Sequence, residues 1–422
     1  MAATLAEILP AAAARHLERT ALVVDHQRLS FSELDFLSNR IANGLVAIGV
    51  QPGDRVGLLG ANSWEWVASY YGIAKTGAVL NPLSSMLATD VLSYMVADAG
   101  TRVAIGSQAQ AGQLHDLKAA GALDHIVLWG DGEAGDATEL GDWLSQRSAA
   151  FTARPRQPSD PAVIAYTSGT TGRPKGAMQS HRAVVAAAVG TALMAARTAQ
   201  DRIVSALPMF HVYGSSVLNA AMLAGSMLIT LPRFCEAAML RAIATHRATM
   251  IDGVPTTYDD LLAHAEFDRY DLSSLRLCWA GWQTLPAATS LEFARRAGCP
   301  MHEVWGMTEL AGAASANPIH GTNKPGTIGL PYPGSAFRVV DPEEPSRDVP
   351  RGEPGELMYS GPLVMMGYCN DPAATAATLR PDGWLHTGDI AVMDDDGYVR
   401  IVDRKTDMIL TAGFDFGVRS GE

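Results

Sequence analysis

From about residue 20 to residue 310, short runs rich in β-branched residues alternate with longer segments of helical periodicity. Predicted strands include Ala21–Val24, Arg55–Leu59, Arg102–Ile105, His125–Leu128, Val163–Tyr166, Met227–Leu231 and Met250–Asp252. Predicted helices between them include Phe31–Ile48, Trp64–Thr76, Ala183–Ala196 and Pro286–Arg296. An alternation of this kind predicts an α/β fold built of layers with largely parallel sheets.

The pattern changes after about Lys324, where Gly, Pro and short alternating runs dominate. Strands are predicted there at Ala336–Val340, Glu356–Tyr359 and Tyr398–Val402, and acid–Gly pairs at 382–383 and 396–397 favour hairpin turns. The Pro-containing stretch 152–160 indicates a linker farther upstream. We therefore expect two stacked α/β subdomains over residues 1–155 and 156–324, a smaller β-rich subdomain over 325–402, and a terminal segment over 403–422.

Composition narrows the class of protein. The chain has 422 residues, enough for two or three domains, and its net charge of −12 argues against nucleic acid or anionic membrane as a partner. The longest apolar stretch, Val184–Ala196, is too short to span a bilayer, and no signal peptide is evident. The 4 cysteines form no C-x-x-C pair, which favours buried free thiols over a zinc site. We expect a cytoplasmic protein.

The strongest local signal is the run Thr167–Gly176, TSGTTGRPKG, which directly follows a predicted strand. Its glycines let the backbone approach a ligand closely, and its amide groups, hydroxyls and Lys175 supply donors and a positive charge. Such a loop suits a polyphosphate. The Walker A pattern does not fit, because Pro174 stands where that pattern requires glycine. A generic polar turn is the alternative, but such turns rarely combine these residues.

This loop resembles the phosphate-binding motif of the adenylate-forming (AMP-binding) enzymes: acyl-CoA synthetases, luciferases and the adenylation domains of peptide synthetases. Further segments follow in the family's order, at Pro208–Gly214 (PMFHVYG), Trp305–Glu309 (WGMTE), Gly361–Tyr368, Thr387–Asp389 (TGD) and Asp403–Asp407 (DRKTD). The resemblance covers essentially the whole chain and favours a fatty-acid or aryl-acid CoA ligase. It implies ATP, Mg²⁺ and coenzyme A as cofactors and co-substrates, with a carboxylic acid as the partner.

The resemblance implies a role for each motif, and residue chemistry agrees. Glu309 offers a hard oxygen ligand for Mg²⁺ beside phosphates, Thr308 can donate to the α-phosphate, and Asp389 can accept from ribose hydroxyls. Trp305 offers a flat face to adenine, although a core tryptophan is the plain alternative. The expected catalytic residues are Thr167, Lys175, His211, Thr308 and Glu309, with Glu309 as the metal ligand. The expected nucleotide contacts are Ser168, Gly169, Thr170, Thr171, Gly172, Gly281, Trp282, Gln283, Trp305, Gly306, Met307, Asp389, Ile401 and Arg404.

An acyl pocket is expected beside the PMFHVYG segment. The resemblance makes His211 an aromatic gate between the carboxylate site and the pocket, although a histidine satisfied at the surface is equally typical. The pocket residues are expected to be His211, Tyr213, Gly214, Ser215, Ala280, Val304 and Met307. Trp282 stands where the family usually has a small residue, so we expect its indole to shorten the pocket. Neither nucleic acid nor a membrane span is expected, and a homodimer is one assembly open to the chain.

The C-terminal end departs from the family pattern. The family's C-terminal domain carries a lysine that bridges carboxylate and phosphate during adenylation, but no lysine follows Lys405 here. The segment 411–414 begins like the family's next motif, and the residues after it do not continue that motif. We therefore expect a shortened chain, a natural fragment or a frameshifted product, which binds ATP and acid but adenylates poorly.

Two other functions remain open. A stand-alone adenylation domain that loads a carrier protein usually places an Asp near the acyl-pocket motif, and Phe210–Gly214 contains none. A non-catalytic remnant that binds nucleotide or an acyl ligand is favoured by the missing lysine. Binding of ATP without AMP formation for any acid would favour the remnant.

Overall fold

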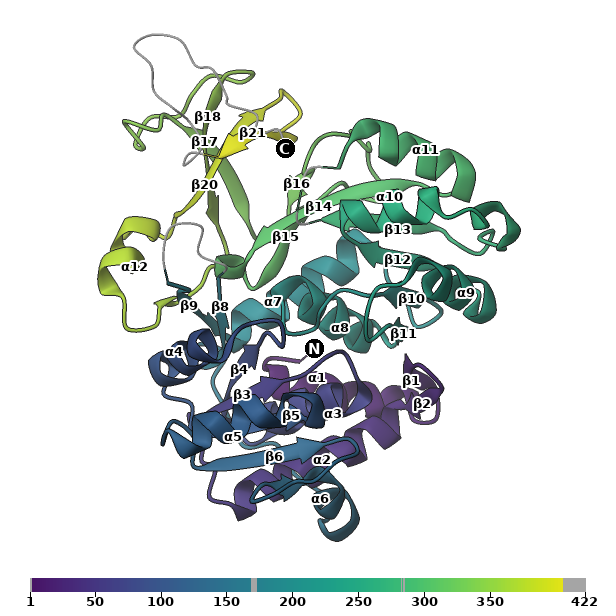
Figure 1. Cartoon of the computed structure of the whole chain (residues 1–422). Coiled ribbons are helices and arrows are strands. Elements are labelled where there is room, and N and C mark those ends of the chain that lie inside the picture. Colours follow the sequence, from purple (N-terminus) through teal and green to yellow (C-terminus); the bar gives the residue numbers. More distant parts are fainter. Residues whose placement is uncertain (1, 168–172, 282, 284, 405–422) are drawn as a thin grey trace.

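The computed structural model of the chain describes residues 2–167, 173–281, 283 and 285–404. Its described residues form three sheets, two of them largely parallel and one antiparallel (Figure 1). The predicted α/β fold with a smaller β-rich part is therefore confirmed.

The first sheet, sheet A, is parallel at its centre and antiparallel at both edges. In spatial order it contains β16 (Leu330–Pro331), β15 (Gly312–Ala316), β14 (Met301–Met307), β13 (Leu277–Gly281), β12 (Met250–Gly253), β10 (Arg202–Ser205), β11 (Met227–Thr230), β1 (Thr20–Val24) and β2 (Gln27–Ser30). The central parallel strands β1, β10, β12 and β13 are mostly buried on both faces, as is typical of parallel sheets covered by helices, whereas the edge strand β2 is largely exposed.

The second sheet, sheet B, is also largely parallel. In spatial order it contains β19 (Gly367–Tyr368), β9 (Gly176–Ser180), β8 (Pro161–Tyr166), β4 (Val79–Leu83), β3 (Arg55–Leu59), β5 (Val103–Ser107), β6 (His125–Trp129) and β7 (Thr138–Glu139). Strands β9 and β19 pair antiparallel at one edge, so residues far apart in sequence meet there.

The third sheet, sheet C, is antiparallel and small. It contains β17 (Ala336–Val340), β18 (Pro354–Ser360), β20 (Leu385–Met393) and β21 (Val399–Arg404). Gly397 lies in the β20–β21 turn with φ of +86°, a conformation that glycine adopts without strain. The predicted hairpin at this acid–Gly pair is confirmed.

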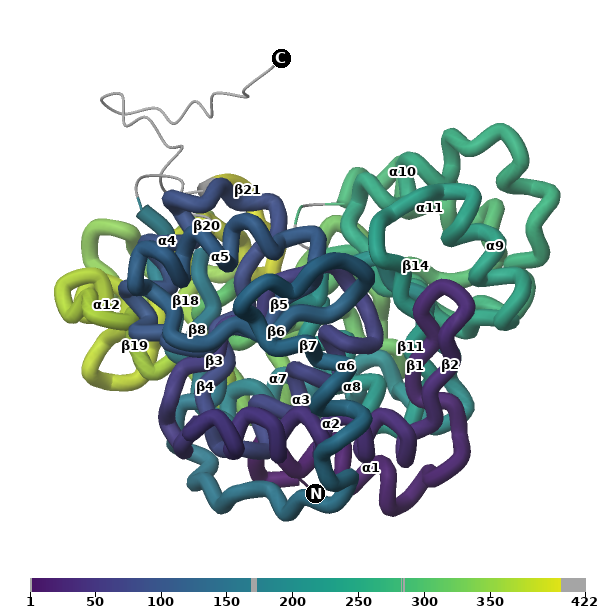
Figure 2. The backbone as a smooth tube through the Cα atoms, turned by 60° about the horizontal axis from the view of Figure 1, so that its bottom comes forward, coloured from purple at the N-terminus to yellow at the C-terminus, as the bar shows by residue number. Residues whose placement is uncertain are grey.

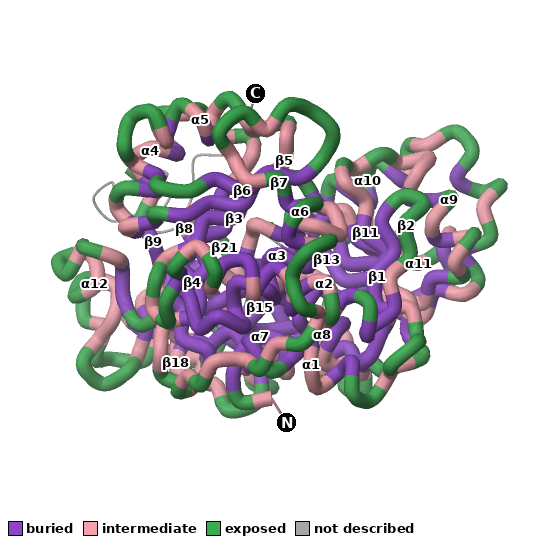
Figure 3. Tube along the Cα trace, turned by 90° about the horizontal axis from the view of Figure 1, so that it is seen from below, coloured by how far each residue is buried: buried purple, intermediate pink, exposed green. Residues whose placement is uncertain are grey.

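Helices fill the space between sheets A and B and cover their outer faces. The largest apolar cluster joins both sheets through α1 (Leu5–His16), α2 (Phe31–Ala47), α3 (Trp64–Lys75), α7 (His181–Met194) and α8 (Val212–Ala224). The outer face of sheet A carries α9 (Glu236–His246), α10 (Pro255–Ala263) and α11 (Ala287–Ala297), and that of sheet B carries α4 (Thr89–Ala99) and α5 (Ala111–Ala119). The short helices α6 (Leu140–Gln146) and α12 (Pro372–Thr378) complete the set, and Figure 2 shows α9, α10 and α11 grouped together. Burial follows these layers, with the strands mostly buried in Figure 3.

The chain passes between sheets A and B more than once. Strands β1 and β2 lie within residues 1–155 but belong to sheet A, beside β11. Strands β8, β9 and β19 lie beyond residue 155 but belong to sheet B. The β1–β11 and β9–β19 pairings join segments over 100 residues apart in sequence, which local periodicity does not reveal.

The sequence also led us to expect no membrane-spanning helix and buried free cysteines. No described helix is long and apolar enough to cross a membrane. Cys278 and Cys299 are buried free thiols, as expected, with their Sγ atoms 3.3 Å apart. The expectation of burial is wrong for Cys235, which is exposed because it caps the outer helix α9.

His181, at the start of α7, makes folding stability sensitive to acid. Its Nδ1 accepts a hydrogen bond from the Leu5 N–H at 3.2 Å, and burial lowers the pKa of this histidine to about 4. The unfolded chain therefore protonates this histidine more readily than the folded chain does. As the pH is lowered from 6.5 to 4, the free energy of unfolding should fall by at most about 1.4 kcal/mol per pH unit. Urea unfolding of His181→Asn, which keeps an acceptor at the Nδ1 position, should show a shallower acid dependence. An unchanged slope would contradict this assignment.

Candidate active site

The predicted phosphate loop is the connection of a β-hairpin. Strands β8 and β9 pair antiparallel up to Tyr166 and Gly176, and beyond them the Thr167 N–H donates to the Lys175 carbonyl at 3.0 Å. Thr167 and Lys175 therefore face each other across the mouth of the loop. The other predicted loop residues lie outside the described residues: Ser168, Gly169, Thr170, Thr171 and Gly172.

A tyrosine connects this loop with the predicted metal ligand. The Tyr368 hydroxyl donates to Glu309 Oε1 at 2.6 Å, and the Lys175 Nζ atom lies 5.2 Å from the centre of the Tyr368 ring. Tyr368 is held in place because its N–H donates to Thr375 Oγ1 at 2.9 Å. The structure thus brings two predicted catalytic residues, Lys175 and Glu309, to one aromatic side chain.

The end of β14 places Thr308 and Glu309 in a single 3-10 turn, where both residues are buried. The Thr308 carbonyl accepts from Gln179 Nε2 at 2.8 Å, and the Glu309 carbonyl accepts from the Met365 N–H at 2.8 Å. Gly306 precedes this turn, and a Cβ there would lie 1.9 Å from the Gly312 carbonyl oxygen. Gly306 is therefore required for the close approach of β14 and β15.

The residues around Glu309 fit a magnesium ion shared with phosphates. Among the described residues, no group of three or more metal-binding side chains gathers in one place. Mg²⁺ is commonly bound through one or two carboxylates, with phosphate oxygens and water completing its coordination. Glu309 supplies one such carboxylate, oriented by Tyr368.

The predicted ribose carboxylate lies on sheet C, facing sheet A. Asp389 on β20 is buried, and its Oδ2 accepts from the Trp305 indole N–H at 2.9 Å. Arg404 on β21 is the register partner of Asp389. Ile401 lies on the same strand, where it pairs with Ala391 of β20. The edge of Trp305 thus holds Asp389, while its ring packs edge-on against Phe337 with centroids 5.9 Å apart.

His211 is the N-cap of α8 and is uncharged near neutral pH. Its Nδ1 accepts from the Tyr213 N–H at 3.3 Å, and burial lowers the pKa of His211 to about 3. The remaining ring proton therefore lies on Nε2. The next residues differ in their surroundings: Tyr213 is buried, a Cβ on Gly214 would lie 2.2 Å from the Pro208 carbonyl oxygen, and Ser215 is only half-buried.

The remaining predicted residues, some of the acyl pocket and some of the nucleotide site, lie at or after the ends of β13 and β14. A Cβ on Gly281 would meet the Val304 Cγ1 at 2.7 Å and the Tyr213 Cε1 at 3.2 Å, so these three predicted residues are in contact. Met307 is half-buried at the end of β14, whereas Ala280 packs in the opposite apolar cluster, beneath α10 and α11. Its placement there follows from the alternation of side chains along a strand. Gln283 is exposed, and Trp282 lies outside the described residues.

The sequence did not single out Gln179 or Tyr368 as site residues. Gln179 holds Thr308 from 129 positions away, and Tyr368 holds Glu309 from 59 positions away. Tyr368 is the last residue of the segment Gly361–Tyr368 that resembles the family. Nothing in the sequence indicated, however, that its hydroxyl donates a hydrogen bond to Glu309.

Tyr368→Phe should separate the two contacts of this side chain. The ring beneath Lys175 remains, while Glu309 loses a hydrogen bond, so we expect AMP formation to fall about tenfold, on the scale of one charged hydrogen bond. The Mg²⁺ concentration for half-maximal ATP binding should rise, as measured by calorimetry. Tyr359→Phe, in sheet C, serves as a control that leaves this Mg²⁺ dependence unchanged. A wild-type Mg²⁺ requirement in Tyr368→Phe would contradict the role given to its hydroxyl.

The candidate residues come from all three sheets. The loop and Tyr368 belong to sheet B, Trp305 lies on β14 of sheet A with Thr308 directly after that strand, and Asp389 lies on sheet C. This arrangement is that of the large N-terminal domain of adenylate-forming enzymes. The family model of the AMP-binding enzymes matches residues 9–369, and the chain belongs to this family.

Sequence relatives and solved structures agree with the family. A long-chain-fatty-acid–CoA ligase of Bacillus subtilis (strain 168) is 32% identical over 99% of this chain and 80% of its own length. A feruloyl-CoA synthase of an Amycolatopsis species is 37% identical over 91% of this chain and 75% of its own length. The anthranilate CoA ligase AuaEII in complex with anthranoyl-AMP is 27% identical with a TM-score of 0.92, covering 99% of this chain and 82% of that one. ATP-bound MatB from Rhodopseudomonas palustris is 31% identical with a TM-score of 0.88, covering 97% and 81%.

These relatives confirm the enzyme class expected from the sequence, an AMP-forming acid–CoA ligase. The expected use of ATP, Mg²⁺ and coenzyme A is likewise that of the class.

Proposed function

We propose that this chain is the large part of an ATP-dependent carboxylate–CoA ligase acting on a fatty or aryl acid. One observation carries the proposal: Lys175, Tyr368 and Glu309 form a connected set at the loop mouth, and Gln179 fixes the neighbouring Thr308. Relatives named for fatty acids and for feruloyl groups support both classes of acid.

The proposed chemistry has two steps. An oxygen of the acid's carboxylate attacks the α-phosphorus of ATP, and the bond to the β-phosphate oxygen breaks to release pyrophosphate. The sulfur of coenzyme A, having lost its proton, then attacks the acyl carbon, and AMP leaves. Catalysis of this kind rests on positioning and on neutralising charge rather than on a nucleophilic side chain.

Each residue has a proposed task in these steps. Thr167 and Lys175 bind the β- and γ-phosphates at the loop mouth, Thr308 donates to the α-phosphate, and Asp389 with Arg404 binds the ribose. Glu309 would hold Mg²⁺, which when bound neutralises phosphate charge. His211, neutral with its proton on Nε2, can donate to the acid's carboxylate or shield it from water.

The expected acyl pocket remains a proposal, with Tyr213, Val304 and Met307 on its wall and the predicted nucleotide contact Gly281 beside them. We keep the restricted pocket as a proposal because Trp282 follows Gly281 directly. Replacement of Trp282 by Gly should extend the accepted chain length. The cytoplasmic location and a homodimer are likewise proposals.

Release of AMP across a library of acids tests the function. The assay compares the 422-residue polypeptide with the same polypeptide joined to the C-terminal domain of a relative, because this chain spans 80% and 75% of the length of two relatives. We expect AMP release with at least one fatty or aryl acid, faster in the extended polypeptide. ATP binding without AMP release for any acid in either form would instead favour the non-catalytic remnant. AMP release only with amino acids would favour the carrier-loading domain.

A further inference from the structure

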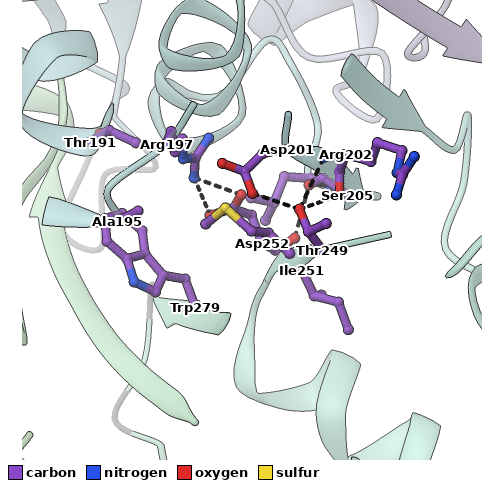
Figure 4. Close-up of polar contacts among 12 residues, drawn as sticks. Thr191, Ala195, Arg197, Asp201, Arg202, Ser205, Thr249, Ile251, Asp252 and Trp279 are labelled. Atoms are coloured by element: carbon purple, nitrogen blue, oxygen red, sulfur yellow. Dashed lines mark hydrogen bonds and ion pairs between the residues drawn. The ribbon is translucent and has the colours of Figure 1, made fainter. Parts of the chain in front are cut away.

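A fully buried ion pair joins the turn after α7 to strand β12. Arg197 Nη2 donates to both carboxylate oxygens of Asp252, at 2.8 and 2.7 Å, and neither side chain is exposed (0% each; Figure 4). The turn that carries Arg197 is fixed from outside, since Arg276 donates to the Ala195 and Ala196 carbonyls and to Asp201. Arg197 is therefore held rigidly.

The same cluster presents hydrogen-bond donors that have no partner. Within the part of the chain that the structure describes, Arg197 Nε and Nη1, the Trp279 indole Nε1 and the Tyr213 hydroxyl are buried without one. The Arg197 guanidinium carbon lies 5.6 Å from the centre of the Trp279 ring. Buried donors of this kind are costly unless an acceptor reaches them. Three side chains here can all donate and have no partner among the described residues, so an oxygen acceptor, from a ligand or an ordered water, would satisfy them.

Strand geometry places this cluster on the pocket side of sheet A. Trp279 and Gly281 are two residues apart on β13, so they share one face, and Asp252 is the register partner of Trp279 on β12. Tyr213 contacts that face at Gly281, where a Cβ would lie 3.2 Å from its Cε1. Gly281, a predicted nucleotide contact, thus lies between Tyr213 and Val304, two of the predicted pocket residues. The charges of Asp252 and Arg197 both act on its hydroxyl, whose pKa burial raises.

We propose that Arg197, Trp279 and Tyr213 form a polar recess that binds a neutral oxygen at the far end of the acid substrate. This inference rests on the proposed function, because it takes the ligand to be a carboxylic acid. The oxygen is a carbonyl, ether or phenol oxygen carried by an aryl or cyclic acid. The recess therefore selects oxygenated acids over plain fatty acids of the same size.

Charge decides between a neutral oxygen and a second carboxylate. Arg197 and Asp252 already neutralise each other, so a neutral acceptor leaves the buried cluster neutral. A second carboxylate would place an uncompensated negative charge beside Asp252, away from water. A hydrogen-bonding recess also discriminates strongly against ligands that lack the acceptor, since its donors then stay unpaired.

A matched pair of acids tests the recess. We choose 3-(4-methoxyphenyl)propanoate and 3-(4-ethylphenyl)propanoate, which differ in shape only by an oxygen in place of a methylene. The protein should bind the methoxy acid about tenfold more tightly by calorimetry, as expected for one buried hydrogen bond. In Tyr213→Phe the ratio of the two affinities should fall to about threefold or less, because the hydroxyl that would donate to the ether oxygen is gone.

Two controls keep the result interpretable. Tyr213→Phe removes a hydroxyl without a partner, so its melting temperature should not fall. Tyr258→Phe removes a satisfied hydroxyl, which donates to the Trp279 carbonyl at 2.6 Å, so it should melt lower and keep the wild-type acid preference.

The outcomes are distinct. Equal binding of the two acids by the wild type, or an unchanged ratio in Tyr213→Phe, would overturn the recess. AMP release measured with Mg·ATP and coenzyme A in the same samples tests the ligase separately. A preference for the methoxy acid without AMP release would refute the ligase and support the recess.

Discussion

Replacement of Glu309 by Gln is expected to lower acid-dependent AMP formation by about 100- to 1000-fold, the scale at which loss of one preorganised electrostatic group slows an enzyme. Glutamine keeps the size of the side chain, and its amide oxygen can still accept from the Tyr368 hydroxyl. The negative charge that would hold Mg²⁺ is lost, however. Calorimetric titration of ATP at several Mg²⁺ concentrations should show that Mg²⁺ no longer strengthens binding.

Glu303→Gln is the matched control for this change. Glu303 lies six residues earlier at the start of β14, where it is buried and its Oε1 accepts from the Gly326 N–H at 2.5 Å. Its substitution should alter stability and leave the Mg²⁺ dependence intact. Wild-type Mg²⁺ dependence in Glu309→Gln would contradict the assignment of Glu309 as the metal ligand.

Replacement of Arg197 by Met is expected to have the largest effect on stability. It leaves the Asp252 carboxylate buried and without its partner, which typically costs about 3–5 kcal/mol of unfolding free energy. Burial raises the pKa of Asp252, so the loss should grow as the pH rises and ionisation of this carboxyl becomes more unfavourable in the folded state. Urea unfolding at pH 5 and pH 8 measures both the loss and its direction with pH.

The double variant Arg197→Met/Asp252→Leu tests the reason for the loss. Replacing a buried pair by apolar side chains is often neutral or stabilising, so the double variant should recover most of the stability, and its difference in stability from the wild type should not grow with pH. Arg295→Met, which removes an exposed partner of Glu292, should change stability little. Equal stability of the single and double variants would show that an unpaired Asp252 is not the cause.

The local part of the fold was predictable from sequence, and its long-range part was not. Arg55–Leu59 and Ala336–Val340 form strands as predicted, because β-branched runs between turn residues report on local conformation. The addition of β1 and β2 to sheet A depends on pairing with β11, some 200 residues later. Such contacts have no local signal.

The site shows the same division. Motif order placed Glu309, Asp389 and Lys175 in one site, but the hydrogen bonds from Tyr368 to Glu309 and from Trp305 to Asp389 depend on the tertiary fold. The position of Ala280 was predictable in one respect. Neighbouring side chains of a strand point to opposite faces of the sheet, so Ala280 lies on the face opposite to Trp279 and Gly281 on β13.

The central claim is that this site forms an acyl-adenylate. Acid-dependent exchange of labelled pyrophosphate into ATP measures that step directly, without coenzyme A. We predict exchange with a fatty or aryl acid, slow in the 422-residue polypeptide, faster when a relative's C-terminal domain is joined to it, and lowered about 100- to 1000-fold by Glu309→Gln. Absence of exchange with every acid in the extended polypeptide, with ATP still bound, would contradict the claim.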